Sequence, residues 1–495
     1  MTTHVEVAIV GAGFAGLGMA LALRRAGRES FVLLERGSAV GGTWRDNDYP
    51  GVACDVPSHL YGFRSHPHPD WTARFAPGAE IAGYLEEVVR AERLGDRIRL
   101  RSPMTAARWD RASATWHVST GPGGDEYRAD VLVLACGRLT EPTIPDIPGL
   151  ESFPGAMFHS ARWDHGADLT GARVAVVGTG ATAIQLVPEL ARRAAVVLFQ
   201  RTPAWILPRG DHAYTVAERE EFARHPESMR ALRDVLFEEG EARFASRSGA
   251  IAASEEAKRA ALAHLTAHVP DPVLRAALTP DYAFGCKRVL LSDAFYPSLA
   301  DGRVTLEPSA LASVDGSDLV SARGTRHTVD ALVFATGFEA ARQPYAELVS
   351  GEHGTLAEHW SDGMTSFAST LVSGFPGMFV LNGPNASLGH NSAILMIEEQ
   401  ADYVVRTLAR RDARGGGVLR LDPAAERAYT AEIDAAAAAT PWLTGRCRTW
   451  YVDDRSGRLT LLWPGTARAF HRRLAEADGS EFTIAPVESA PRGTR

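Results

Sequence analysis

The hydrophobic pattern near the N-terminus predicts a strand, a glycine-rich turn and a helix in immediate succession. Residues 5–10 form a short apolar run rich in Val, which is typical of a buried parallel strand. The turn Gly-Ala-Gly-Phe-Ala-Gly follows at residues 11–16, a helical stretch covers residues 17–26, and residues 30–35 predict a second strand. This succession is the βαβ unit on which dinucleotides bind.

The same succession occurs a second time, further along the chain. Residues 174–177 predict a strand, residues 178–183 form the turn Gly-Thr-Gly-Ala-Thr-Ala, residues 184–193 predict a helix, and residues 196–200 predict a strand. Two such units imply two nucleotide sites on two doubly wound domains.

The remaining pattern indicates how these two units are arranged. A proline-rich stretch at residues 141–153 predicts a crossing between domains, and residues 215–277 predict a helical insertion. We therefore expect an α/β fold with two Rossmann-like dinucleotide-binding domains. The first is discontinuous and takes residues 1–145 and 325–495. The second is inserted between them, takes residues 150–324 and carries the helical insertion.

The composition narrows the class of protein. Hydrophobic residues make up 45% and charged residues 23%, which is typical of a globular protein, and the net charge of -8 argues against nucleic-acid binding. No apolar run is long enough to span a membrane, and the N-terminus has no secretory pattern. We expect a cytoplasmic protein that is a monomer or a weak homo-oligomer.

The cysteines and histidines suggest neither a metal site nor a disulfide. The four cysteines include no C-x-x-C pair, and sparse unpaired thiols fit a reducing compartment. His66 and His68 stand close together without a third ligand in view. We therefore expect no metal.

The first glycine turn meets the requirements of a dinucleotide site. Gly11 permits the tight turn, Gly13 lets a pyrophosphate approach the backbone, and Gly16 lets helix and strand pack closely. The helix N-terminus attracts phosphate groups. Glu35, which lies 19 residues after Gly16, can accept hydrogen bonds from ribose hydroxyls.

The second turn differs in two positions, and both differences are informative. Its last glycine is replaced by Ala183, which the pattern allows. Its following strand ends in Gln200-Arg201-Thr202, so no acidic residue stands where Glu35 stands in the first unit. Because an arginine pairs with the 2′-phosphate that a carboxylate would repel, Arg201 predicts NADPH at this site.

Two longer patterns resemble a known family. Residues 153–164 read Phe-Pro-Gly-Ala-Met-Phe-His-Ser-Ala-Arg-Trp-Asp, and the chain also contains Gly-Gly-Thr-Trp at residues 41–44, Tyr-Pro-Gly at residues 49–51, and then Asp55. Together with the two turns, these patterns resemble the Baeyer–Villiger monooxygenases from about residue 5 to about residue 465. The related heteroatom-oxidising flavin monooxygenases share the turns, but Trp163 followed by Asp164 favours the Baeyer–Villiger branch.

The resemblance implies a flavoenzyme that holds FAD on the first unit and NADPH on the second. In this family NADPH reduces the flavin, O₂ adds to it, and the flavin peroxide attacks a ketone to give an ester or a lactone. The implied partners are therefore a small-molecule ketone and O₂.

The resemblance also implies roles for individual residues. Lys287, one of only two lysines in the chain, would contact the 2′-phosphate of NADPH. Arg288 would stabilise negative charge that develops on the oxygenated flavin, and Asp55 would orient Arg288. His159 would coordinate domain closure, and Trp450 would lie near nicotinamide and substrate.

Further residues are assigned to cofactor binding by the same resemblance. Those near the first unit are Phe14, Ala15, Arg36, Gly42, Thr43, Trp44, Tyr61 and Met104. Those near the second unit are Gly178, Thr179, Gly180, Ala181, Thr182, Ala183, Gln185 and Thr202.

Two departures from the family pattern leave the substrate open. Ala53 stands where many members have an arginine, and the loop at residues 383–392, expected near the flavin, differs from that of small-ring ketone oxidisers. A heteroatom oxygenase that acts on sulfides or amines is the alternative function. A flavin-binding redox sensor without turnover is a further alternative, and a disulfide reductase is disfavoured because no C-x-x-C pair is present.

Overall fold

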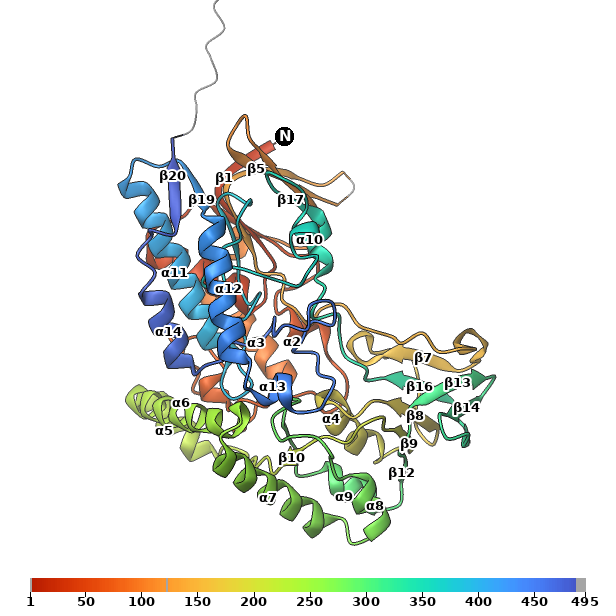
Figure 1. The fold of residues 1–495 in the computed structure, drawn as a ribbon. Coiled ribbons are helices and arrows are strands. Elements are labelled where there is room, and N and C mark those ends of the chain that lie inside the picture. Colours follow the sequence, from red (N-terminus) through yellow and green to blue (C-terminus); the bar gives the residue numbers. More distant parts are fainter. Residues whose placement is uncertain (1, 122, 487–495) are drawn as a thin grey trace, which may run out of the picture.

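The computed structural model describes residues 2–121 and 123–486, which form two α/β lobes joined by long connections (Figure 1). In this part of the chain the larger sheet has eight strands. Seven of them follow the spatial order β17 (Val349–Ser350), β4 (Met104–Asp110), β5 (Thr115–Thr120), β6 (Glu126–Leu134), β1 (Thr2–Val10), β2 (Phe31–Leu34) and β3 (Ile98–Arg99). The eighth strand, β18 (Met378–Val380), pairs with β6.

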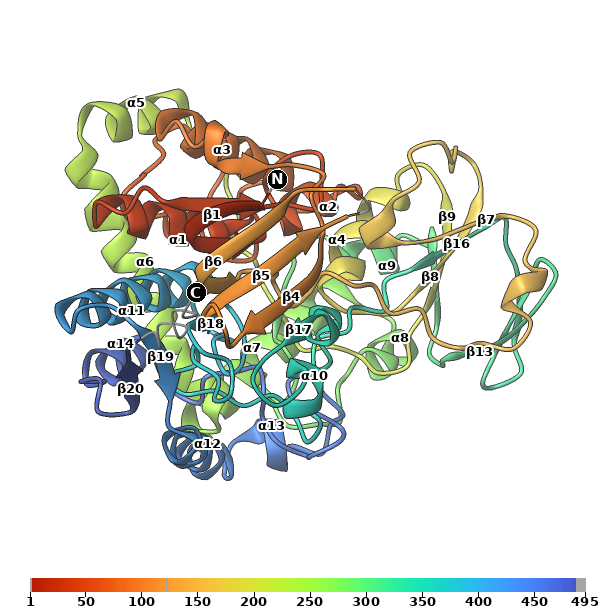
Figure 2. The ribbon, with the colours of Figure 1, turned by 90° about the horizontal axis from the view of Figure 1, so that it is seen from above.

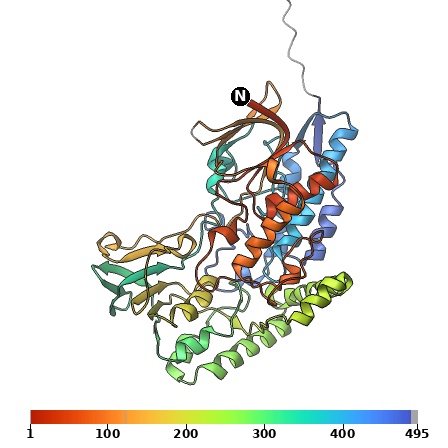
Figure 3. The same ribbon diagram turned by 180° about the vertical axis from the view of Figure 1, so that it is seen from behind.

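The apolar N-terminal run forms the centre of this sheet, as the pattern predicts. Strand β1 lies between β2 and β6 and runs parallel to both, and its last residue Val10 is level with Leu34 and Leu134. Helix α1 (Phe14–Arg25) packs against α11 (Ala393–Ala413), so a C-terminal helix completes the cover over the N-terminal unit (Figure 3).

The second sheet lies to one side of the first, as Figure 2 shows. Its five strands are all parallel and follow the order β12 (Val304–Glu307), β9 (Ala195–Phe199), β8 (Arg173–Val177), β16 (Ala331–Phe334) and β7 (Ala156–His159). Helix α4 (Ala181–Leu190) contacts β8, β9 and α9 (Phe295–Ala300). A small antiparallel sheet is added by β13 (Leu311–Asp315), β14 (Asp318–Ser321) and β15 (Arg326–Thr328).

The position of β16 bears on the predicted domain boundary. The sequence pattern returns the chain to the first domain near residue 325, but β16 pairs with β7 and β8 of the second sheet. The next strand, β17, pairs with β4 of the first sheet. We therefore propose that the chain returns to the first domain between Phe334 and Val349. Strand β16 is still part of the second sheet, so the boundary must follow it.

The predicted helical insertion consists of α5 (Val216–Arg224), α6 (Pro226–Ser248), α7 (Ile251–His268) and α8 (Pro272–Ala277). Helix α5 begins with a capping box in which Thr215 and Glu218 exchange hydrogen bonds. Helix α6 contacts the turn η1 (Ser58–Leu60) of the first lobe, whereas α7 contacts β10 (Ile206–Leu207) of the second. The insertion therefore packs against both lobes (Figure 1).

The remaining elements cover the sheets and the connections between them. They are α2 (Thr43–Asp46), α3 (Gly78–Ala91), η2 (Gly95–Arg97), η3 (Leu150–Ser152), η4 (Ser160–Arg162), β11 (Leu290–Leu291), η5 (Pro344–Leu348), α10 (Leu356–His359), β19 (Val418–Leu421), α12 (Pro423–Ala437), α13 (Pro441–Thr444), α14 (Ala467–Ala475) and β20 (Phe482–Ala485). Within the described residues, none of the helices combines the length and the apolar character that crossing a membrane requires.

Candidate active site

The first glycine turn leaves no room for a Cβ at Gly11 or at Gly16. Gly11 has a φ of +106°, and a Cβ there would lie 2.4 Å from the carbonyl oxygen of Ala135. A Cβ on Gly16 would lie 1.9 Å from the carbonyl oxygen of Gly11. Helix α1 has no acidic residue in its first turn, so its free N–H groups are available to an anion.

Glu35 is buried beside this turn and is held by the protein. Its side chain is 5% exposed. Its oxygens accept hydrogen bonds from the N–H groups of Ala12 (2.9 Å) and Gly37 (2.7 Å) and from the guanidinium of Arg45 (2.7 Å). These donors fix the carboxylate at the end of β2, and its contact with a ribose stays a prediction.

The residues that the resemblance adds near this turn form an aromatic group. The Trp44 indole N–H donates to the Tyr61 hydroxyl at 3.3 Å, and the Phe14 ring lies edge-on to Tyr61 with centroids 5.2 Å apart. Gly42 precedes α2, which begins at Thr43, and Gly42 lies against Gly13 of the first turn. Phe14 and Ala15 are both buried at the start of α1.

Two further predicted cofactor residues have other contacts in the structure. The Arg36 guanidinium pairs with the carboxylate of Glu141. Met104 is buried in the core of the larger sheet together with Leu34. Their roles toward a cofactor stay predictions.

The second turn repeats the geometry of the first. Gly178 has a φ of +114°, and a Cβ there would lie 2.5 Å from the carbonyl oxygen of Ala335. The Thr179 hydroxyl donates to the carbonyl oxygen of Thr202 at 2.9 Å, which ties the turn to the end of the next strand. Helix α4 begins directly after the turn and has no acidic residue in its first turn. The remaining predicted residues of the turn are Gly180, which caps α4, and Ala181, Thr182 and Ala183, which form its first turn.

Gln185 connects the two lobes. Its side-chain oxygen accepts from the Tyr49 hydroxyl at 2.9 Å, and its amide N–H donates to the carbonyl oxygen of Ala53 at 2.9 Å. The resemblance assigns Gln185 to cofactor binding, whereas these contacts hold helix α4 of the second lobe against the loop before Asp55. Ala53, one of the departures from the family pattern, takes part through its backbone.

Arg201, which follows β9, lies close enough to Lys287 for the two charges to interact. Burial lowers the pKa of Lys287, and the neighbouring Arg201 cation lowers it further. The Lys287 ammonium lies 5.0 Å from the centre of the Tyr282 ring. Among the described residues neither cation forms an ion pair with a carboxylate, although the charge of Asp281 acts on Lys287 from a longer distance. Both charges can therefore pair with an anionic group.

Asp55 and Arg288, 233 residues apart, form an ion pair where the lobes meet. The Arg288 guanidinium donates from Nε at 3.0 Å and from Nη2 at 2.6 Å to the same oxygen of Asp55. Burial alone would raise the pKa of Asp55, but the charge and hydrogen bond of Arg288 outweigh it, and the pKa is lowered. The Asp55 charge in turn raises the pKa of Arg288, so both groups stay ionised.

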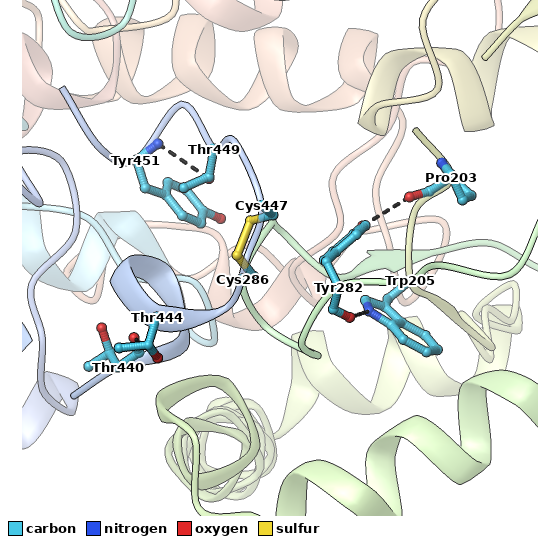
Figure 4. Close-up of a disulfide and its surroundings, with 9 residues drawn as sticks. All are labelled: Pro203, Trp205, Tyr282, Cys286, Thr440, Thr444, Cys447, Thr449 and Tyr451. Atoms are coloured by element: carbon cyan, nitrogen blue, oxygen red, sulfur yellow. Dashed lines mark hydrogen bonds between the residues drawn. A yellow bond between two sulfur atoms is a disulfide. The ribbon is translucent and has the colours of Figure 1, made fainter. Parts of the chain in front are cut away.

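A disulfide joins the loop of Arg288 to a C-terminal loop, as Figure 4 shows. Cys286 and Cys447 are bonded although 161 residues separate them. The prediction of unpaired thiols is therefore wrong for these two residues, because only the tertiary fold brings them together. Cys54 and Cys136 are free.

Tyr451, the neighbour of the predicted residue Trp450, lies beside Arg288 of the ion pair. The Trp450 and Tyr451 rings lie 4.6 Å apart. Burial raises the pKa of the Tyr451 phenol and the adjacent Arg288 cation opposes this change. Trp450 is 37% exposed, so its indole remains accessible to a ligand.

Sequence reasoning missed a second arginine at this site. Arg138 follows β6 in the turn Ala-Cys-Gly-Arg, is 8% exposed, and donates to the Ser387 hydroxyl. Its Nη1 has no hydrogen-bond partner among the described residues. Burial lowers the pKa of Arg138 to about 10, and the nearby Arg288 cation contributes. The one signal in the sequence is an arginine that stands shortly after a buried strand.

Within the described part of the chain, His159 has no contact that suggests proton transfer. It ends β7, and its Nδ1 accepts from the N–H of Ala161 at 3.1 Å. Burial lowers the pKa of His159 to about 4, so the imidazole is neutral. Trp163 packs edge-on to Phe158, and Asp164 accepts from the N–H of Gly166. The conformational role of this motif stays a prediction.

Comparisons with known proteins agree with this arrangement. A family model described as pyridine nucleotide-disulphide oxidoreductase matches residues 8–230. A Baeyer–Villiger monooxygenase of Streptomyces coelicolor is 44% identical over 99% of this chain and 95% of its own length. A Baeyer–Villiger monooxygenase of Pseudomonas aeruginosa is 40% identical over 97% of this chain and 92% of its own length.

Solved structures give the same assignment over nearly the whole chain. A steroid monooxygenase bound to NADP is 29% identical, with a TM-score of 0.85 and coverage of 97% of this chain and 99% of its own. A cyclohexanone monooxygenase from Rhodococcus sp. Phi1 bound to NADP⁺ is 26% identical, with a TM-score of 0.87 and coverage of 98% and 100%. The fold and its paired glycine turns thus define an oxidoreductase with two dinucleotide sites. Within that class, the chain belongs to the Baeyer–Villiger monooxygenase family.

Proposed function

We propose that this enzyme uses NADPH, O₂ and bound FAD to convert a small-molecule ketone into an ester or a lactone. In the balanced reaction one NADPH, one proton, one O₂ and one ketone give NADP⁺, water and the ester. The observation that carries the proposal is the Asp55–Arg288 pair, which places a fixed cation where the two lobes meet.

The residues of the first turn fit FAD. Gly11 and Gly16 are packed against backbone where any side chain would clash, and Gly13 lies at the N-terminus of α1, which carries no acidic residue in its first turn. We assign the pyrophosphate to this helix end and the ribose to Glu35. When bound, FAD supplies a carrier that takes a hydride from NADPH and passes the electrons to O₂.

The second turn fits NADPH in the same way. Gly178 and the N-terminus of α4 would hold the pyrophosphate, and Arg201 with Lys287 would hold the 2′-phosphate. The absence of a carboxylate partner for these two cations among the described residues supports this assignment.

Arg288 and Asp55 then divide two tasks between them. Arg288 presents a permanent positive charge to the reacting atoms, because its raised pKa keeps it protonated. Asp55 is a positioning residue, since it accepts hydrogen bonds from two of the five guanidinium N–H groups of Arg288. The Arg288 guanidinium is therefore already oriented to stabilise the negative charge that develops during oxygen transfer.

The test combines cofactor and product analysis. The purified protein should release FAD on denaturation, and ketones should stimulate NADPH oxidation with ester formed in equal amount. Oxidation of sulfides without any ester from a ketone panel would favour the heteroatom oxygenase instead. A folded protein that cannot take up FAD would contradict both functions.

We also propose a cytoplasmic location, where NADPH is supplied. Disulfides are uncommon in that compartment, so the Cys286–Cys447 bond makes the location open to test. Fractionation of expressing cells, with trapping of free thiols before lysis, would measure both the location and the state of this bond.

A further inference from the structure

A cavity of about 260 Å³ opens beside the Asp55–Arg288 pair. Its walls come from the loop around Asp55, from β10 and the residues after it, from α6 and α7, and from the loop at residues 389–391. Apolar side chains such as Val56, Phe75 and Val289 form much of the lining. The cavity therefore combines an apolar wall with direct access to the candidate active site.

The charged residues of this cavity are almost all of one sign. They are Arg74, Arg209, Arg243, Arg247 and Arg288, with Asp55 as the one carboxylate that lines the cavity in the described part of the chain. The carboxylates behind the wall compensate this charge only in part. Glu239 is shared, at 3.3 Å from Arg74 and 3.4 Å from Arg243, and Asp211 lies 3.7 Å from Arg209.

Of the arginines that line this cavity, Arg247 is the one with no carboxylate partner among the described residues. It is 7% exposed, and among residues 2–121 and 123–486 no carboxylate forms an ion pair with it. Its Nη1 donates to the Ser246 hydroxyl at 3.0 Å, and its guanidinium lies over the Phe284 ring at 5.0 Å. Its Nε has no hydrogen-bond partner among the residues that the structure describes. Burial, and then the neighbouring Arg243 cation, lower the pKa of Arg247 to about 10. A buried guanidinium is costly unless an anion pairs with it.

The phosphates of the two cofactors do not account for this charge. The cavity is lined by no residue of either glycine turn, and neither Arg201 nor Lys287 belongs to its wall. Phosphates held at the N-termini of α1 and α4 would therefore lie at other sites. The anion that completes the cavity must belong to a different ligand.

We propose that the natural substrate is a ketone that carries a carboxylate, which pairs with Arg247 while the carbonyl faces Arg288. This inference rests on the proposed function and deepens it. A guanidinium binds a carboxylate through two parallel hydrogen bonds, so it fixes both the position and the orientation of the substrate. The apolar wall would hold the aliphatic part between the two polar ends.

The experiment compares acids with their own esters on the FAD-loaded enzyme. The probes are straight-chain methyl ketones that end in a carboxylate, from levulinate upward in chain length, and the methyl esters of the same acids. For the best chain length, kcat/KM should be higher for the acid than for its methyl ester by about 10- to 100-fold. The variant Arg247→Met should remove most of this preference by raising KM for the acid, with little change for the ester.

Two further variants separate charge from packing. Arg247→Lys keeps the charge and should recover part of the acid preference. Arg230→Met makes the same change at an exposed arginine of α6 and should leave the preference unchanged. The dissociation constant of the acid can be measured on the oxidised enzyme from the change in flavin absorbance. In Arg247→Met this constant should rise by the same factor as KM.

The outcomes distinguish this inference from the proposed function. Equal use of acids and esters, or an equal loss for both in Arg247→Met, would overturn the carboxylate site while ester formation still supports the function. Acid binding that depends on Arg247, without ester from any ketone, would support the anion site and overturn the function.

Discussion

Replacement of Arg288 by alanine should separate consumption of NADPH from formation of product. Arg288 has five N–H donors, and two of its N–H groups, on Nε and Nη2, donate to Asp55. Arg288 also lines the cavity, with Tyr451 beside it. Hydride transfer to FAD does not require this cation, whereas oxygen transfer to a carbonyl builds negative charge beside it.

The size of the effect follows from what the side chain supplies. Removal of one preorganised donor from an active site costs about 100- to 1000-fold in rate, or about 3–4 kcal/mol. We expect a loss of at least this size in ester formation by Arg288→Ala, because the variant also leaves the Asp55 carboxylate unpaired. Arg288→Lys should be intermediate, since an ammonium keeps the charge but cannot reproduce the two contacts with Asp55.

The assay follows three quantities in parallel. Stopped-flow absorbance measures flavin reduction by NADPH, gas chromatography measures ester, and a peroxidase-coupled assay measures hydrogen peroxide. Arg288→Ala should retain FAD and its reduction, and should return oxygen as hydrogen peroxide. Arg224→Ala, at an exposed arginine paired only with Glu220 in the described structure, is the matched control. Ester formation at the unchanged rate in Arg288→Ala would refute the reasoning.

Four further predictions concern the cofactor sites, the disulfide and pH. Arg201→Ala should lower the preference for NADPH over NADH by about 10- to 150-fold, measured as the ratio of kcat/KM values; an unchanged ratio would contradict the assignment. Cys447→Ser should lower the free energy of unfolding by about 2–4 kcal/mol, measured by denaturant unfolding, and excess dithiol should destabilise only the parent enzyme. Gly16→Ala should abolish FAD retention, because its Cβ would lie 1.9 Å from a carbonyl oxygen, whereas Gly83→Ala, with nothing within 4 Å, should retain FAD. Because the pKa of Asp55 is lowered from 3.8, its stabilising contribution is present above that value and is lost as pH falls through the lowered pKa. The difference in Tm between the parent and Asp55→Ala should therefore be constant above about pH 5 and shrink in stronger acid.

The parts of the fold that depend on neighbouring residues could be predicted from the sequence. Both glycine turns lie between a strand and a helix, as expected, because a tight turn and its flanking apolar runs are local features. The family resemblance singles out Asp55 and Arg288, and the structure brings these two residues into contact.

The parts that depend on distant residues could not be predicted in this way. The disulfide joins Cys286 to Cys447, and no spacing in a sequence of four cysteines indicates that pair. Arg247 has no carboxylate partner because none of the described residues brings one close to it in the folded chain. A single sequence does not show which charges lie close together in space. The sheet to which β16 belongs could not be recognised from its residues, because a short apolar run fits the centre of either sheet.

The second sheet is formed by residues that lie between two parts of the first sheet in the sequence, and this order has a consequence for synthesis on the ribosome. The last strand of the second sheet ends at Phe334, whereas β17, β18 and α11 of the first lobe are supplied by residues 349–413. The inserted lobe can therefore complete its sheet while the N-terminal lobe still lacks two strands and the helix that covers α1. During elongation the N-terminal lobe is therefore synthesised first but completes its fold last. Until then its apolar face stays exposed, and chaperones would bind that surface.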